Sequence, residues 1–190
     1  ALRHAVNQVM QFNANPMFRD VGEAKKLSFQ QILKQAQRAV SEQVSMRTDF
    51  YDRNHIPVIS GRGTLLDKNT LKLDGKRTKL TADYFIIATG SRPYRPPEID
   101  FNHSNVFDSD TILEQTQTPR RIIIFGAGVI GCEYASIFNG LGCKVDLVNP
   151  GDRLLAFMDD EISDALSYHM RSHGVLIRHN EAFESLTSSN

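Results

Sequence analysis

The sequence predicts an α/β fold that combines a parallel nucleotide-binding unit with an antiparallel β segment, and three observations support this prediction. A short apolar run at residues 122–125 leads into a glycine-rich turn, a helix-forming segment and a second apolar run at 145–148. Between residues 55 and 88, apolar residues recur with a period of two, which is typical of strands. The stretch before them has apolar residues at helical spacing, which predicts a long amphipathic helix.

Composition limits the classes of protein that the chain can represent. Of its 190 residues, 41% are apolar, which is enough for a hydrophobic core. The 22 basic residues balance 22 acidic residues, so the net charge favours neither nucleic acid nor an anionic membrane surface as a partner. Charged residues interrupt every apolar run before membrane-spanning length, and no signal-peptide pattern opens the chain. We therefore expect a cytoplasmic protein.

Cysteine and histidine give no sign of a disulfide scaffold or a metal site. Cys132 and Cys143 are the only cysteines, and neither belongs to a CxxC motif or a ligand cluster. They suggest a reduced compartment, and we expect both to be buried packing residues. Only His169 and His173 have a spacing that could place two histidines on one helix face, and no third ligand lies near them in sequence.

The N-terminal part of the chain is predicted to be helical. Apolar residues at positions 2, 6, 9, 10 and 12 predict a helix over residues 1–12, and residues 13–22 are expected to form a loop. Ser28 is a suitable N-cap for a long amphipathic helix that should end near Asn54. One face of this helix would carry Phe29, Ile32, Leu33, Ala36, Val40, Val44 and Phe50.

An antiparallel β segment is expected next. The predicted strands cover residues 56–59, 63–66, 70–73 and 80–88, with turns at 67–69 and 74–75. A proline-rich linker follows at residues 93–97. Asp108 is then a good N-cap for a short helix over residues 111–115.

The glycine-rich turn between the first strand and the helix of the parallel unit is the strongest functional signal. We call it the glycine turn; its residues are Gly126, Ala127, Gly128, Val129, Ile130 and Gly131. Gly126 allows the tight turn, Gly128 lets the backbone approach a pyrophosphate, and Gly131 lets the helix pack close to the strand. The N–H groups and positive dipole end of the helix would face the phosphates. Dinucleotide binding is favoured over a purely structural turn because the motif lies between a strand and a helix.

The residue after the second strand bears on nucleotide specificity. NAD-binding units usually place Asp or Glu about 20 residues past the glycines to bind the ribose 2′-OH. This chain has Asn149, whose neutral amide could bind the 2′-OH without repelling a 2′-phosphate, and Arg153 could reach that phosphate. The pattern predicts a loop that accepts both NAD(H) and NADP(H). The alternative is that Asn149 forms a turn before Pro150 and that Arg153 is solvated.

The end of the chain continues the alternation of helix and strand. Residues 159–173 are predicted to form a helix with acidic residues near its start, Gly174 ends it, and a third strand begins at residue 175. The chain starts without Met inside a predicted helix and ends just after this strand pattern. Both ends suggest a fold that is truncated on either side.

Four segments occur in order along the chain: ALRH, FIIATGSRP, GAGVIGCEYAS and DRLLAFMDDEI. Together they resemble the pyridine nucleotide–disulfide oxidoreductase family of flavoproteins, and the resemblance covers essentially the whole chain. It implies FAD- and NAD(P)-binding Rossmann-like domains with an antiparallel β insert. Residues 1–112 would be the C-terminal part of the first FAD-binding segment, and residues 113–190 the first half of the NAD(P)-binding domain. The parent protein would be a homo-oligomer that assembles through a C-terminal domain missing from this sequence.

The resemblance also implies an activity and site residues. The activity is transhydrogenation, in which a hydride passes from NADPH to NAD⁺, or in reverse, through FAD. Glu133 would lie near the flavin and the nicotinamide, although an acid at a helix start is also explained by the helix dipole. Thr89, Gly90 and Ser91 would contact FAD at a strand end, and Gly63 would meet its adenine. The glycines have a plain alternative explanation as turn or bulge residues.

Two other functions remain open. One is a dihydrolipoamide dehydrogenase-like disulfide reductase, which would need a redox cysteine pair upstream of Ala1. The other is a nucleotide-binding fragment without catalysis. The piece covered by this sequence is itself expected to be inactive, because the resemblance places the FAD fingerprint and the active-site lysine upstream of residue 1.

Overall fold

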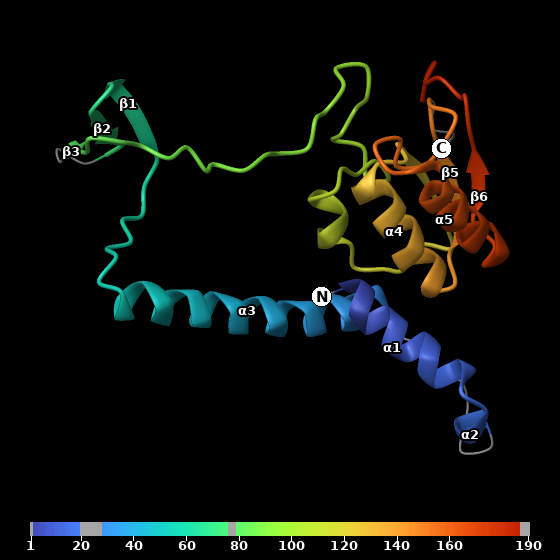
Figure 1. Ribbon diagram of the computed structural model, residues 1–190. Helices are drawn as coiled ribbons and strands as arrows, with labels where there is room; N and C mark the ends of the chain where they lie inside the picture. The colour runs from blue at the N-terminus through green and yellow to red at the C-terminus, as the bar shows by residue number, and fades with distance from the viewer. Residues whose placement is uncertain (1, 20–27, 76–78, 187–190) are drawn as a thin grey trace. The chain divides into compact units, whose positions relative to one another are not determined.

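The computed structural model describes residues 2–19, 28–75 and 79–186. Figure 1 shows a mixed α/β structure, as the sequence predicts. One three-stranded sheet is antiparallel and the other is parallel, which confirms both predicted β patterns. No helix in the described part of the chain is both long and apolar enough to cross a membrane.

The chain divides into two compact units. The first unit contains Ala1–Ser41 and Pro93–Asn190, and the second contains Glu42–Arg92. Helix α3 (Phe29–Arg53) begins in the first unit and ends in the second. The predicted domain boundary between residues 112 and 113 stays a prediction.

The first unit contains the parallel sheet. Its strands are β4 (Arg121–Phe125), β5 (Lys144–Val148) and β6 (Leu176–Arg178), in that order across the sheet. Helix α4 (Val129–Gly140) connects β4 to β5, and α5 (Asp160–Ser172) connects β5 to β6. Two crossovers of the same hand that step in the same direction place both helices on one face of the sheet. The sequence predicted the three strands and α5 to within about two residues, and it predicted a helix at the place of α4, as expected for strongly periodic segments.

The hydrophobic core of the first unit lies between the helices and this sheet. Val145 and Leu147 of β5 are buried beneath the helices. Phe138 of α4 is fully buried, and its ring lies 5.0 Å from the ring of Phe29 at the start of α3. Burial of side chains of this size contributes roughly 1.5–3 kcal/mol each. This contact attaches the N-terminal end of α3 to α4.

The N-terminal helices differ in part from the prediction. Helix α1 (Leu2–Ala14) confirms the first helix, while Ala1 lies outside the described residues. The loop prediction is wrong at Pro16–Arg19, which form the short helix α2. Proline suits the first turn of a helix, and Asn15 Oδ1 accepts the N–H of Met17 at 3.0 Å. Positions 20–22 of the predicted loop lie outside the described residues.

Helix α3 begins where its cap was predicted. The N–H of Ser28 donates to Gln31 Oε1 at 2.8 Å, and the N–H of Gln31 donates to Ser28 Oγ at 3.3 Å, which is a capping box. The predicted apolar face is buried only near this end, at Phe29 and Ile32. Farther along the helix, the same face is about half exposed, at Val40, Val44 and Phe50.

The second unit contains β1 (Gly63–Asp67), β2 (Thr70–Leu73) and β3 (Lys79–Thr81), which form the predicted antiparallel sheet. The strand predicted at residues 56–59 is wrong, and the strand predicted over residues 80–88 ends at Thr81, so residues 82–88 are not a strand. Within the described ranges, neither segment pairs with another strand, and Tyr84 and Ile86 are more than 90% exposed. A strand needs a neighbour for its backbone hydrogen bonds, and an apolar alternation alone does not supply one.

The predicted N-cap residue of the short helix after the linker is wrong by two positions, because Asp110 is the N-cap, but the Asp108 carboxylate binds the N–H groups at the helix start. Its Oδ1 accepts the N–H of Thr111 at 2.8 Å and the N–H of Asp110 at 2.9 Å. The helix is the 3₁₀ turn η1 (Thr111–Glu114). The hydrogen bond from the Thr111 N–H, aided by the ion pair with Arg95 at 2.6 Å, lowers the pKa of Asp108 to about 2.

Candidate functional site

The carboxyl ends of the three parallel strands are aligned. The residues paired at these ends are Phe125 with Val148 and Val148 with Arg178. The first residues beyond the strands, Gly126, Asn149 and His179, therefore form a row along one edge of the sheet. In open parallel sheets, ligands bind beyond this edge. The row marks the candidate site.

The glycine turn has the geometry that its sequence predicts. Gly126 has φ +105°, a conformation that other residues rarely adopt, and its N–H donates to Val148 O at 2.8 Å. A Cβ on Gly131 would collide with the carbonyl oxygen of Gly126. The structure thus explains why the turn needs glycine at both positions.

The start of α4 offers unpaired backbone donors. Gly128 is the N-cap, and a Cβ built on it would meet no described atom within 4 Å. The N–H of Cys132 donates to Gly128 O at 3.0 Å, so the N–H groups of Val129, Ile130 and Gly131 precede the first helical hydrogen bond. These donors and the positive end of the helix dipole suit an anionic group such as a pyrophosphate.

Asn149 is committed to shaping the loop after β5. Its Nδ2 donates to Arg153 O at 2.8 Å and to Gly151 O at 3.1 Å, and the residue is only 7% exposed. The guanidinium of Arg153 forms an ion pair with Asp160 at the start of α5. The predicted contacts of Asn149 with a ribose and of Arg153 with a 2′-phosphate stay predictions.

The loop after β5 is also attached to the glycine turn. The N–H of Leu155 donates to Ala127 O at 3.0 Å, and the preceding Leu154 is fully buried. Leu155 has φ +46°, so this contact holds a non-glycine residue in the left-handed region. Sequence reasoning missed this connection, because a backbone hydrogen bond leaves no signature in residue type.

His179 was also missed by sequence reasoning. Its Nδ1 lies 3.3 Å from Nδ2 of Asn149. A signal for it exists in the sequence: His179 follows the third predicted strand as Asn149 follows the second, and parallel strands end at a common edge.

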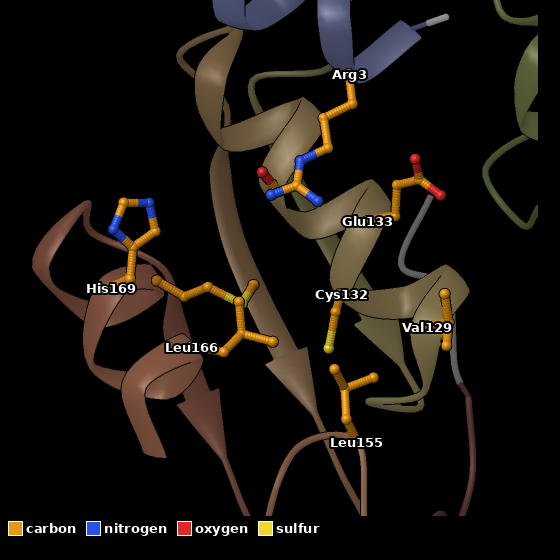
Figure 2. Close-up of a pocket in the computed structure, with 9 residues that line it drawn as sticks. Arg3, Val129, Cys132, Glu133, Leu155, Leu166 and His169 are labelled. Atoms are coloured by element: carbon orange, nitrogen blue, oxygen red, sulfur yellow. The ribbon is translucent and has the colours of Figure 1, made fainter. Parts of the chain in front are cut away.

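Glu133 lies on the exposed side of α4, next to a pocket of about 310 Å³. Figure 2 shows Arg3 extending from α1 across α4 and His169 on α5 at another edge of this pocket, whereas the Glu133 carboxylate points away from His169. The predicted role of Glu133 near a flavin and a nicotinamide stays a prediction.

The two cysteines are buried, as predicted. Cys132 borders the pocket, and its Sγ lies 3.4 Å from Ala127 O. Burial raises the pKa of both Cys132 and Cys143, which disfavours the reactive thiolate.

His169 lies on α5 and His173 directly follows the end of this helix. The rings of His169 and His173 lie 4.3 Å apart. Among the described residues, no group of three or more potential ligands is placed to hold a metal ion.

The remaining predicted residues belong to the second unit. Gly63 begins β1, where a Cβ would lie 3.1 Å from the side chain of Leu71. Gly90 has φ +68°, and it is exposed together with Thr89 and Ser91. A turn glycine explains Gly90 on local grounds. The FAD contacts predicted for these residues stay predictions.

Comparison with known proteins agrees with the resemblance found in the sequence. The family described as pyridine nucleotide-disulphide oxidoreductase matches residues 6–190. The soluble pyridine nucleotide transhydrogenase of Marinobacter nauticus is 56% identical over 188 residues, covering 98% of this chain and 41% of the relative. The soluble pyridine nucleotide transhydrogenase of Pseudomonas paraeruginosa is 58% identical over 187 residues, covering 97% of this chain and 40% of the relative. The chain therefore spans about two fifths of the length of these curated relatives.

Solved structures give the same fold. The Cu(II) complex of the HOCl-induced flavoprotein disulfide reductase RclA from Escherichia coli matches with a TM-score of 0.75 at 22% sequence identity. The match covers 100% of this chain and 40% of that chain. This likeness shows the fold alone.

Proposed function

We propose that this chain, which belongs to the pyridine nucleotide-disulphide oxidoreductase family, is the nucleotide-binding part of an FAD-dependent NAD(P)⁺ transhydrogenase. The complete enzyme would transfer a hydride from NADPH to NAD⁺ and in the reverse direction. The observation that carries the proposal is the 56–58% identity, over almost the whole chain, to proteins named soluble pyridine nucleotide transhydrogenase. The same name favours this activity over disulfide reduction.

The first unit fits a dinucleotide. Open space lies where a Gly128 side chain would stand, and the first N–H groups of α4 precede its first helical hydrogen bond. A pyrophosphate in that space would accept hydrogen bonds from these donors and gain from the helix dipole. Gly126 and Gly131 would keep the turn compact enough for this approach.

The second unit fits part of an FAD site. Thr89, Gly90 and Ser91 are exposed, and a Cβ on Gly90 would meet no described atom within 4 Å. Small residues of this kind allow a cofactor to approach closely. Gly63 would lie beside the adenine, and Glu133 would help to orient the flavin and the nicotinamide. When bound, FAD supplies the redox chemistry, because its ring accepts a hydride and can return it.

The loop after β5 would accept both nicotinamide nucleotides. Nδ2 of Asn149 is occupied by the carbonyls of Gly151 and Arg153, so Oδ1 is the atom that would accept a hydrogen bond from the ribose 2′-OH. Arg153 would contact the 2′-phosphate of NADP(H). Its partner Asp160 is 77% exposed, and an ion pair that exposed contributes little, so a phosphate can compete for the guanidinium.

The decisive assay is the reduction of thio-NAD⁺ by NADPH with the complete gene product. We expect steady turnover and a protein with visible flavin absorbance. A colourless protein, or a flavoprotein that reduces lipoamide with NADH but does not reduce thio-NAD⁺ with NADPH, would contradict the proposal. We further propose that the complete protein is a cytoplasmic homo-oligomer, which sedimentation and cell fractionation would test.

A further inference from the structure

His179 is the third member of the row beyond the strand ends, next to Asn149. Neighbouring strands lie about 4.8 Å apart, so His179 is one strand spacing from the residue expected at the ribose 2′ position. The histidine is half-buried.

Backbone hydrogen bonds hold the two strand ends together. Asn149 N donates to Arg178 O at 2.8 Å, and Glu181 N donates to Asn149 O at 3.1 Å. Asn180, which has φ +57°, donates its N–H to Gly151 O at 3.0 Å. The segment that carries His179 is therefore fixed against the loop that carries Arg153.

The contacts of Asn149 determine which ring nitrogen of His179 carries the proton. The carbonyls of Gly151 and Arg153 require a donor, so the NH₂ end of the Asn149 amide faces them. That same Nδ2 lies 3.3 Å from His179 Nδ1, and a protonated Nδ1 would place two donors face to face. In the neutral ring the proton consequently lies on Nε2, which becomes a hydrogen-bond donor.

Charge in the loop leaves a role for such a donor. Asp152 and Arg153 carry opposite charges, and Arg153 is paired with Asp160. Arg153 is therefore the one basic side chain that this loop would offer to a 2′-phosphate, and the acidic Asp152 lies next to it in sequence. A donor from the neighbouring strand end would add a second contact to the one that Arg153 would make.

We propose that His179 is a specificity residue that recognises the 2′-phosphate of NADP(H) through Nε2–H, with Asn149 as the residue that positions its ring. This inference rests on the nucleotide site of the proposed function. The ligand class is an adenosine nucleotide that carries a 2′-phosphate. The 2′-OH of NAD(H) presents no charged oxygen there, so the contribution of His179 is smaller for that nucleotide.

The test is calorimetric binding of 2′,5′-ADP and 5′-ADP to the complete gene product. His179→Phe keeps a ring of similar size but removes both nitrogens. We expect it to weaken 2′,5′-ADP about tenfold and 5′-ADP less than about twofold, since a hydrogen bond to a charged group has a large differential effect. His179→Gln, which restores a side-chain donor, should recover most of the 2′,5′-ADP affinity. The control is His173→Gln, at an exposed position after α5, and should change neither affinity.

Several outcomes would overturn the proposal. They are equal losses for both probes in His179→Phe, no loss for either, a failure of wild-type protein to bind 2′,5′-ADP, or a shift of the same size in the His173 control. If His179→Phe does not fold, the comparison of His179→Gln with wild type decides, and a loss of about tenfold in 2′,5′-ADP affinity in the Gln variant would contradict the proposal. Binding requires no turnover, so the role of His179 can hold even where the transhydrogenation assay fails. Equally, transhydrogenation can be observed even where the binding measurements contradict a role for His179.

Discussion

At the scale of single residues, two positions of the glycine turn carry glycine for different physical reasons. A side chain at Gly131 would run into the carbonyl of Gly126, so the position is closed by the protein itself. A side chain at Gly128 would face open space, so the protein does not require glycine there. Packing explains the glycine at position 131, and the proposed pyrophosphate would explain the glycine at position 128.

We predict that Gly131→Ala and Gly128→Ala separate stability from binding. Overpacking at residue 131 should lower the free energy of unfolding by roughly 1–3 kcal/mol, measured by urea denaturation of the complete gene product. Gly128→Ala should change it by less than about 1 kcal/mol, yet weaken NAD⁺ binding about tenfold in calorimetry by blocking the phosphate. Equal effects of the two variants on either measurement would contradict this assignment.

Asp108 provides a residue-level prediction about pH. Its folded pKa of about 2 lies below the unfolded value near 3.9, so the cap contributes stability above about pH 4 and loses it as the pH falls toward 2. Asp108→Ala should therefore destabilise the protein by about 1 kcal/mol at pH 7, and the difference from wild type should narrow between pH 4 and 2. A difference that stays constant across this range, in denaturation measured at each pH, would show that the carboxylate is not the source.

At the scale of elements, the close approach of α1 and α4 depends on Gly140. A Cβ there would collide with Val6 Cγ1 and lie 2.8 Å from Met10 Sδ. Val6 is buried at this contact. Arg3 on the same helix reaches the pocket beside Glu133, so the spacing of the two helices also sets the shape of that pocket.

We predict that Gly140→Ala destabilises the protein by roughly 1–3 kcal/mol, although alanine is the better helix former by about 1 kcal/mol. Val6→Ala should remove the collision with Val6, although the contact with Met10 remains. The double variant should therefore lose less stability than the sum of the two single losses, by at least about 0.5 kcal/mol. Urea denaturation of the four proteins in this cycle gives the answer. Strict additivity would mean that the helices do not meet as described.

At the scale of the whole molecule, large apolar side chains are exposed in both units. In the second unit, Tyr84 is 91% and Ile86 is 93% exposed; in the first, Ile123 of β4 is 67% exposed. Isolated apolar residues on a surface are ordinary, but strand-like runs such as 84–88 normally pack against something. On β4, Ile123 and Phe125 are both at least half exposed among the described residues.

We predict that the 190-residue chain, produced by itself, binds an apolar dye such as ANS several-fold more strongly than an equal concentration of the complete gene product. The reason is the exposed apolar surface of the 84–88 segment and of β4. Fluorescence titration measures this. If the two proteins bind the dye equally, these side chains are covered within the chain itself.

The parallel unit could be predicted from the sequence because its signals are local. Ile122 to Phe125, the glycine turn and the helix-forming run that follows each determine their own backbone conformation within a few residues. Capping follows the same rule, since Ser28 and Asp108 bond to N–H groups at most three residues away. Strands at 56–59 and 84–88 could not be predicted in this way, because a strand forms only with a neighbour whose position is not local.

The sequence by itself determined the strand–glycine turn–helix order and the chemistry of its backbone donors, since steric limits on φ and the helix dipole act over a few residues. Only the tertiary structure decided what the polar side chains at the strand ends do. The sequence predicted that Asn149 and Arg153 contact a ligand. In the folded loop, the Asn149 amide donates to backbone carbonyls of the loop, and the Arg153 guanidinium forms an ion pair with Asp160. His179 entered the site because the register of two parallel strands brings together residues 30 positions apart.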